Sequence, residues 1–236
     1  MREAGRIVAK TLEVLGAAIE PGVTTLDLDS LAEKFIRSEG ARPAFKGLYG
    51  FPASICASVN EEVVHGIPGL RTLQNGDIIS IDIGTEINGY YGDASCTFPV
   101  GDIWDEAKKL LAVTERALYA GIARARPNNH LSDISFAVQT MVEEHGFSVV
   151  RDYVGHGIGR AMHEEPQVPN FGRPGRGPRL RSGMTLAIEP MVNAGGFEVV
   201  TLADDWTVIT RDRRISAHFE HTVAITDGEP EILTRL

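Results

Sequence analysis

The sequence predicts a single α+β domain that spans residues 1–236. Segments with helical spacing of apolar residues alternate with segments rich in β-branched and aromatic residues, and the order of two helices followed by strands occurs twice. No linker rich in Ser, Gly or Pro separates the two halves. Apolar residues make up 43% of the chain and charged residues 23%, which is typical of a folded globular protein. We therefore expect two related halves that close on one core.

Four segments show the apolar periodicity of amphipathic helices. Residues 3–19 and 27–38 form the expected pair in the first half, and residues 103–124 and 132–145 form the pair in the second. Residues that end helices follow the periodic segments, as Pro21-Gly22 does after the first. The sequence therefore predicts two helices at the start of each half.

Strand-forming residues follow each pair of helices. Six segments are expected to be strands: residues 54–64, 78–98, 147–154, 184–193, 198–210 and 215–226. Asn75-Gly76 and Asn88-Gly89 are dipeptides typical of tight turns between paired strands, so both are predicted to be hairpin turns. The Arg-, Gly- and Pro-rich residues 173–181 are predicted to form a solvated loop.

The charge balance and the distribution of apolar residues exclude several classes of protein. Lys and Arg number 23 against 32 Asp and Glu, and the resulting net charge of −9 disfavours binding to DNA or to an anionic membrane surface. The sequence contains no run of about 18 apolar residues and no apolar signal segment after Met1. Two cysteines, Cys56 and Cys96, are too few for a disulfide framework. We therefore expect a soluble protein of the reducing cytoplasm.

The second predicted hairpin brings two aspartates to one face of a sheet. A two-residue turn at Asn88-Gly89 pairs Gly84 with Asp93, and Asp82 then lies two residues along on the same face. Such diagonal neighbours lie about 7–8 Å apart at the backbone, so both carboxylates can reach a shared cation, and Gly84 is expected to leave space for it. Isoleucines around Asp82 predict that its carboxylate is buried, and a buried carboxylate needs a partner.

Further polar residues stand in unusual surroundings. His156 and His163 lie in a Gly-rich segment, residues 155–164, which we expect to be too flexible for a core element. Glu189 ends an apolar strand segment, and Glu220 lies inside another. Each acid alone is more often a salt-bridged or edge residue. Together with the two aspartates, however, they place four carboxylates among apolar strands, where like charges raise one another's pKa unless cations are present.

Two divalent ions per chain would balance the charge of the four carboxylates, and one neutral histidine would add a further donor. This combination is typical of a two-metal hydrolytic centre, in which ions about 3.5–4 Å apart share a bridging water. Ligation that is rich in oxygen, with a single imidazole, suits manganese, iron or cobalt at least as well as zinc. The sequence therefore predicts a dinuclear metal site without fixing the identity of the ions.

Five ordered motifs of this sequence resemble those of the type I methionine aminopeptidases, members of metallopeptidase family M24. They are Asp82 and Asp93 with ten residues between them, Gly-His156-Gly-Ile-Gly, Met-His163-Glu-x-Pro, Ile-Glu189-Pro-Met and Ser-Ala-x-Phe-Glu220-His-Thr. Val64-His65-Gly66-Ile67-Pro68 is also similar to the substrate-facing histidine motif of that family. The resemblance runs from Arg2 to about Thr226. It implies the pseudo-two-fold "pita-bread" fold, a curved and mostly antiparallel sheet backed by helices.

The resemblance also implies a function. It implies a metalloaminopeptidase that removes the initiator methionine from nascent proteins when the second residue is small, using a water or hydroxide that bridges two ions of cobalt, manganese, iron or zinc. It implies that Asp82 binds one ion, that His156 and Glu189 bind the other, and that Asp93 and Glu220 bridge both. In that family the counterpart of Glu189 also handles the proton of the bridging water.

Other positions match the part of the family's site that contacts the substrate. His65 and His163 correspond to the histidines near the substrate amine and the scissile peptide. The positions that match the methionine pocket are Phe51, Cys56, Met162 and Trp206. Small departures occur, because Leu48 and Met162 replace residues that are often aromatic and His218 stands where Gln is common. The expected partner is the N-terminal methionine of peptides and nascent chains, with the chain acting as a monomer; ribosome binding is left open.

Alternative functions are weighed on chain length and motif content. Aminopeptidase P and prolidase enzymes share such a ligand set and cleave Xaa-Pro bonds, but they generally carry a large additional N-terminal domain, whereas only 81 residues precede Asp82. Type II methionine enzymes insert a helical segment before the last glutamate, for which the chain has no room. A non-catalytic relative usually lacks ligands, and a nucleophilic pair of Cys56 with His65 is a further alternative. The Xaa-Pro enzymes stay open as the second interpretation.

Overall fold

Four α-helices form where the sequence predicts them, in a computed structural model that describes residues 1–235. They are α1 (Arg2–Ala18), α2 (Thr25–Ser38), α3 (Asp105–Ile122) and α4 (Leu131–Glu143), and a turn of 3-10 helix, η1 (Leu48–Gly50), follows the first pair. Local capping explains where α2 begins. Thr24 Oγ1 accepts a hydrogen bond from the Asp27 N–H at 3.1 Å, and Asp27 Oδ2 accepts one from the Thr24 N–H at 3.0 Å.

Short strands make up most of the remaining structure. Those of the first half are β1 (Arg42–Pro43), β2 (Cys56–Val59), β3 (Glu62–Val64), β4 (Ile78–Ile87) and β5 (Tyr90–Pro99). Those of the second half are β6 (Ser148–Val149), β7 (Gly155–Gly157), β8 (Glu164–Val168), β9 (Thr185–Ile188), β10 (Met191–Asn193), β11 (Val199–Thr201), β12 (Val208–Thr210), β13 (Ser216–His218), β14 (His221–Ala224) and β15 (Glu231–Ile232). Every pairing between these named strands is antiparallel, which confirms the predicted α+β fold.

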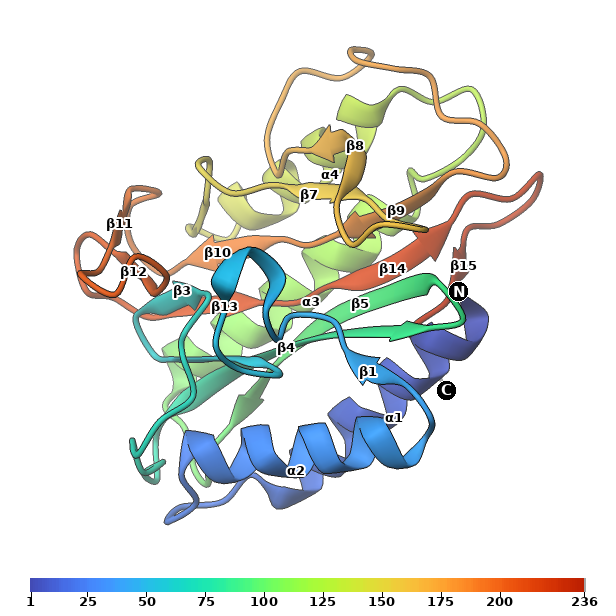
Figure 1. The fold of residues 1–236 in the computed structure, drawn as a ribbon. Helices are drawn as coiled ribbons and strands as arrows, with labels where there is room; N and C mark the ends of the chain where they lie inside the picture. The colour runs from blue at the N-terminus through green and yellow to red at the C-terminus, as the bar shows by residue number, and fades with distance from the viewer. Residues whose placement is uncertain (236) are drawn as a thin grey trace.

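The β4–β5 hairpin forms the centre of the first half. Its turn residues Asn88 and Gly89 have φ of 54° and 76°, and both positive values are those that a two-residue type I′ turn requires. The predicted register is confirmed, with Ile87 opposite Tyr90. Figure 1 shows α1 and α2 side by side beneath this hairpin, where their apolar faces pack with Ile79, Ile81 and Ile83 of β4. Each strand of the hairpin is ten residues long.

The prediction that Asn75-Gly76 is a hairpin turn is wrong. Asn75-Gly76 does form a turn, with Gly76 at φ 100°, but this turn joins no pair of neighbouring strands. It leads from β3 to β4, and β3 pairs with β12 while β4 pairs with β1, β2 and β5. The Gly76 N–H instead donates to the Val100 carbonyl at 2.9 Å. A turn dipeptide fixes the local bend, whereas the strand partners depend on distant residues.

The second half consists of short strands in three sheets. The largest has the order β15-β14-β9-β7-β8, and β10 and β12 are the central strands of two three-stranded sheets, with orders β13-β10-β6 and β11-β12-β3. Within the expected strand 147–154 only β6 forms. Residues 173–181 contain no helix or strand and are mostly exposed, as predicted. Helices α3 and α4 pack behind these sheets and form a second apolar core with β9, β10, β13 and β14.

The first part of the Gly-rich segment, β7, is a buried strand, so the prediction that the segment is too flexible for the core is wrong for residues 155–157. β7 lies between β8 and β9 in the five-stranded sheet. A Cβ atom on Gly155 would lie 2.3 Å from the Ala187 carbonyl oxygen, and one on Gly157 would lie 2.3 Å from that of Glu165. The glycines therefore serve close approach of neighbouring backbone rather than flexibility.

The two halves meet along β5 and β14. Asp93 N–H donates to Thr222 Oγ1 at 3.0 Å, and the same hydroxyl donates to the Asp93 carbonyl at 2.8 Å. The chain ends lie on the same side of the molecule (Figure 1), where Arg2 forms an ion pair with Glu231. Among the described helices, none has both the length and the apolar character needed to cross a membrane.

Candidate metal centre

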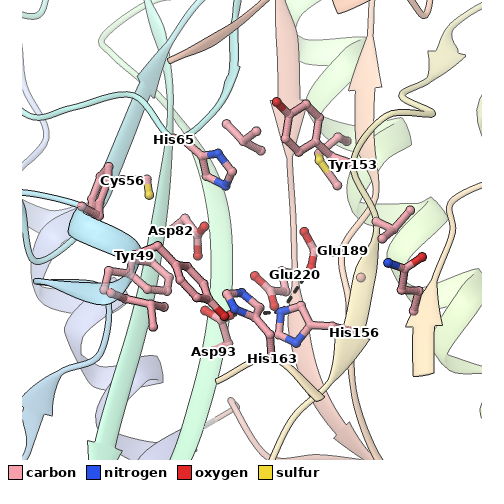
Figure 2. Close-up of a pocket in the computed structure, with 18 of the residues that line it drawn as sticks. Tyr49, Cys56, His65, Asp82, Asp93, Tyr153, His156, His163, Glu189 and Glu220 are labelled. Atoms are coloured by element: carbon pink, nitrogen blue, oxygen red, sulfur yellow. Dashed lines mark ion pairs between the residues drawn. The ribbon is translucent and has the colours of Figure 1, made fainter. Parts of the chain in front are cut away.

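Two carboxylates of the first half, Asp82 and Asp93, face one cavity from neighbouring strands (Figure 2). The hairpin register places Asp93 opposite Gly84 and Asp82 opposite Ser95, as the sequence predicts. Asp93 is 4% exposed. Asp82 is only half-buried because it lines the cavity, although its Oδ1 atom is inaccessible to solvent.

The expectation that Gly84 leaves space for a cation is wrong. A Cβ atom at this position would lie 2.7 Å from the Phe45 ring and 3.0 Å from the methyl group of Met162. The ring and the thioether fill the room that the missing side chain provides. Gly84 therefore allows an apolar cluster to pack against the hairpin.

His156 extends from β7 toward the aspartates (Figure 2). Its Nδ1 lies 2.9 Å from the Gly157 carbonyl oxygen, to which it can only donate, so in the neutral ring the lone pair is on Nε2. That Nε2 lies 3.6 Å from Asp93 Oδ2 and 3.6 Å from Glu189 Oε1. A histidine held in this tautomer presents a metal-binding nitrogen to the carboxylates.

The two glutamates of the second half come from different strands. Glu189 directly follows β9, and Glu220 lies between β13 and β14. The Glu220 N–H donates to the Ser95 carbonyl at 2.9 Å, which fixes this glutamate against β5. Donor atoms of Asp93, His156 and Glu220 lie within 4.8 Å of one another, and all three residues are buried. Four carboxylates and one imidazole thus converge on one wall of the cavity.

Buried oxygens of this cluster lack partners. Asp82 Oδ1, Asp93 Oδ1 and Glu220 Oε1 have no hydrogen bond within the described residues. Burial raises the pKa of Asp82 and of Glu220 well above the usual range, and neighbouring carboxylates raise it further. Burial also raises the pKa of Asp93, against the lowering effect of His156. The cluster is therefore short of positive charge.

A divalent cation fits this shortage. No Lys or Arg in residues 1–235 forms an ion pair with the four carboxylates, and their only cationic contacts are histidines. Burial by itself lowers the pKa of His156, but Asp93 and Glu189 outweigh it and raise that pKa to about 9. Unpartnered carboxylate oxygens together with one imidazole are a donor set that divalent metals accept.

Two further histidines face the cavity from opposite sides. His65 follows β3 with φ 60° and packs edge-to-face against Tyr153 and Trp206, with ring centroids 5.6 and 6.3 Å away. His163 packs edge-to-face against His156 at 4.5 Å. Burial, with a smaller effect of the His218 imidazole, lowers the pKa of His65 to about 4. Burial and the nearby His156 lower the pKa of His163. Both rings are therefore neutral at pH 7.

The wall next to the carboxylates is apolar. The cavity, of about 570 Å³, is lined there by Phe45, Leu48, Phe51, Cys56 and Trp206. Phe51 packs edge-to-face on Trp206 with ring centroids 5.1 Å apart. Met162, in contrast, is not among the lining residues; it is 3% exposed and packs in the cluster behind them.

The geometry disfavours Cys56 as a nucleophile. Burial and the nearby carboxylates Asp82, Asp93 and Glu220 raise the pKa of its thiol well above the usual range. A nucleophilic cysteine needs the opposite surroundings, because the thiolate is the reactive form. Cys56 therefore contributes surface to the cavity and not a nucleophile.

Sequence reasoning missed two aromatic residues of the cavity. Tyr49 has φ 51°, is 77% exposed and stacks on His163, with ring centroids 5.9 Å apart and an interplanar angle of 17°. Tyr153 packs on His65. A signal for Tyr49 was the pair of flanking glycines, Gly47 and Gly50, which mark a tight loop.

Comparisons with known proteins show which family the chain belongs to. The model of metallopeptidase family M24 matches residues 1–227. Methionine aminopeptidase 1 of Bacillus subtilis is 61% identical over 236 residues, which are 100% of this chain and 95% of that protein. The crystal structure of methionine aminopeptidase from Thermotoga maritima matches with a TM-score of 0.99 at 46% identity, covering 100% of this chain and 95% of that chain.

A more distant likeness concerns the fold alone. Prolidase from Pyrococcus horikoshii OT3 matches with a TM-score of 0.81 at 21% identity. The match covers 100% of this chain but 60% of the prolidase chain. The Xaa-Pro enzymes thus share the architecture of these residues at low sequence identity.

Proposed function

The chain belongs to metallopeptidase family M24, and from this premise we propose that it is a methionine aminopeptidase, which removes N-terminal methionine when the second residue is small. The observation that carries the proposal is the cavity itself, where unpartnered buried carboxylates form one wall and an apolar pocket forms the next. The first wall suits divalent cations and a free amine. The second suits an apolar side chain.

We propose that two divalent ions, of cobalt, manganese, iron or zinc, bind at this wall. Asp82 would bind one ion, His156 and Glu189 the other, and Asp93 and Glu220 both. When bound, such ions lower the pKa of a water molecule toward about 7 and polarise the scissile carbonyl. The support for two ions is the balance of four carboxylates by two divalent charges, with a neutral histidine as the fifth donor.

The residues of this chain provide the remaining steps. Glu189 lines the cavity and is proposed to accept the proton of the attacking water and return it to the leaving amine. His65 and His163, both neutral at pH 7, are proposed to hydrogen-bond the substrate and the oxygen that becomes negative in the transition state. The acidic wall favours the free amino group of the substrate.

The apolar wall is proposed to select methionine. Phe51, Cys56, Trp206 and the face of His65 offer aromatic and polarizable surface that suits a thioether, and Met162 supports this wall from behind. Such a pocket discriminates one methylene by only about 1–3 kcal/mol, so norleucine should be accepted and Lys or Glu rejected. The second residue should be small because the peptide passes between His65 and His163.

A matched peptide set tests the proposal. Release of the first residue is measured from Met-Ala-Ser, Met-Lys-Ser, Leu-Ala-Ser, Ala-Pro-Ser and N-acetylated Met-Ala-Ser, with and without a chelator. Cleavage of Met-Ala-Ser, alone or with weak cleavage of Leu-Ala-Ser, is expected, and chelation should stop it. Preferential cleavage of Ala-Pro-Ser would assign the chain to the Xaa-Pro enzymes, and cleavage of the acetylated peptide would exclude an aminopeptidase.

A further inference from the structure

His218 is a buried histidine that has no role in the proposed function. Its side chain is 2% exposed, and Nε2 has no hydrogen-bond partner within residues 1–235. It does not line the cavity, so it touches no substrate. A buried polar atom without a partner is costly and is rare in folded proteins, so this one requires an explanation.

The unpartnered nitrogen faces a proposed metal ligand. His218 Nε2 lies 3.6 Å from Glu189 Oε2, while His156 Nε2 lies 3.6 Å from Glu189 Oε1. The carboxylate of Glu189 is thus held between two imidazoles, one beside each oxygen. This separation is only slightly longer than a hydrogen bond, so a closer approach of Oε2 to His218 Nε2 would form one.

The backbone of His218 is fixed more firmly than the side chain of Glu189. Its N–H donates to Thr97 Oγ1 at 2.9 Å, and its carbonyl accepts from the same hydroxyl at 2.9 Å. Thr97 Oγ1 in turn lies 2.8 Å from Ser80 Oγ in β4. Strand β13 also pairs with β10, with His218 opposite Met191. His218 is therefore anchored to both halves, and the carboxylate is the group that adjusts.

Building on the metal-binding roles proposed above, we propose that His218 is a positioning residue for Glu189. It donates a hydrogen bond from Nε2 to Oε2, which turns Oε1 toward the cation beside His156. An amide at this position, the residue common in the resembling family, can also donate a hydrogen bond from nitrogen. The property that matters is then an N–H donor and not the imidazole ring itself.

The test measures metal affinity and stability separately. Calorimetric titration with Mn²⁺ is carried out on three metal-stripped proteins: the unsubstituted protein, His218→Gln and His218→Leu. Thermal unfolding of the same three proteins is followed without metal. His218→Leu should weaken one of the two sites about 10–100-fold, the usual effect of losing an outer hydrogen bond to a ligand. His218→Gln should stay within about threefold of the unsubstituted protein. The control His145→Leu, at a half-buried histidine that does not line the cavity, should bind Mn²⁺ normally.

Thermal unfolding is the control for folding. Because the bonds from Thr97 to the His218 backbone remain in His218→Leu, the metal-free variant should still unfold in one cooperative transition, so a loss of Mn²⁺ affinity reports the missing donor. His218→Met replaces His218→Leu if the leucine variant does not fold, with the same expectations. The proposal would be overturned if the apolar variant bound Mn²⁺ with normal affinity. It would also be overturned if His218→Gln weakened Mn²⁺ binding as much as the apolar variant does. If the unsubstituted protein bound none of Mn²⁺, Co²⁺, Fe²⁺ and Zn²⁺, the proposed metal centre would itself be wrong.

Discussion

The two halves of the chain supply the candidate metal centre in different ways. The first half places Asp82 and Asp93 on one continuous hairpin, where the register of a tight turn fixes both. The second half places His156 on β7, Glu189 just after β9 and Glu220 between β13 and β14, and these segments are brought together by sheet pairing and by a bond to β5. Local structure positions one set of ligands, and long-range packing positions the other.

The largest expected effect is on hydrolysis and metal content, when one proposed ligand from each half is replaced. Glu220→Ala should abolish hydrolysis of Met-Ala-Ser and remove most bound metal, because Glu220 is proposed to contact both ions. Asp82→Ala should retain about one ion, because Asp82 is proposed to contact only one. Metal content by mass spectrometry, together with the peptide assay, measures both effects. The exposed Glu144→Ala is the control, and equal metal loss in the two variants would contradict the assigned roles.

The second prediction concerns one histidine from each half. His65→Ala and His163→Ala should each lower turnover about 10²–10³-fold, because each removes a hydrogen-bond donor aimed at the transition state. Metal content should stay that of the unsubstituted protein. Turnover and metal analysis on the same preparation separate these effects, with His145→Ala as the control. Loss of metal from His163→Ala would show that it is a ligand.

The third prediction tests the packing that positions His156. Gly155→Ala places a methyl group 2.3 Å from the Ala187 carbonyl oxygen, so the free energy of unfolding should fall by about 1–3 kcal/mol. Gly69→Ala is the matched control, because its new methyl group would meet only one atom, at 4.0 Å, and the effect should stay within about 0.5 kcal/mol. Urea unfolding of both variants measures the difference. Equal stability would show that β7 is not tightly held.

The smallest expected effect is on the pH dependence of the stability of the metal-free protein. The pKa of His156 is raised to about 9 from the ordinary value of 6.5, so the folded state binds a proton more tightly than the unfolded state. The stability that this proton provides is present below about pH 6.5 and is lost as the pH rises toward 9, on the order of 1–3 kcal/mol. Thermal unfolding in the presence of a chelator should show the decline. His156→Gln should make it smaller without removing it, because the raised pKa values of Asp82 and Glu220 act in the same direction. A stability that rose with pH over this range would contradict the shift.

The difference between the halves also explains what the sequence can predict. The register of the β4–β5 hairpin was predictable because Asn88-Gly89 sets the turn, and alternation then sets the face of every residue that follows. The helices were predictable for the same local reason, since their apolar spacing recurs within each segment.

The second half was harder to predict because its strands depend on distant partners. β7 is stable only because Ala187 and Glu165 lie against Gly155 and Gly157, and nothing within the segment itself shows these neighbours. The space at Gly84 was misjudged for the same reason, since Phe45 and Met162 fill it from other parts of the chain. Local patterns nominated the polar residues of the site, and the balance of charge grouped them into a metal centre, but only the resemblance to a family assigned a role to each.

The division of the ligands between the halves links the stability of the fold to the supply of metal. An ion held by Asp93 of β5 and by Glu220, which precedes β14, would connect the two halves, beside the hydrogen bonds of Thr222 that already join them. Any ligand that binds only the folded state stabilises it by mass action, about 2.7 kcal/mol when its free concentration is 100 times its dissociation constant. The concentration of free divalent metal would then affect the stability of the folded protein as well as its catalytic rate.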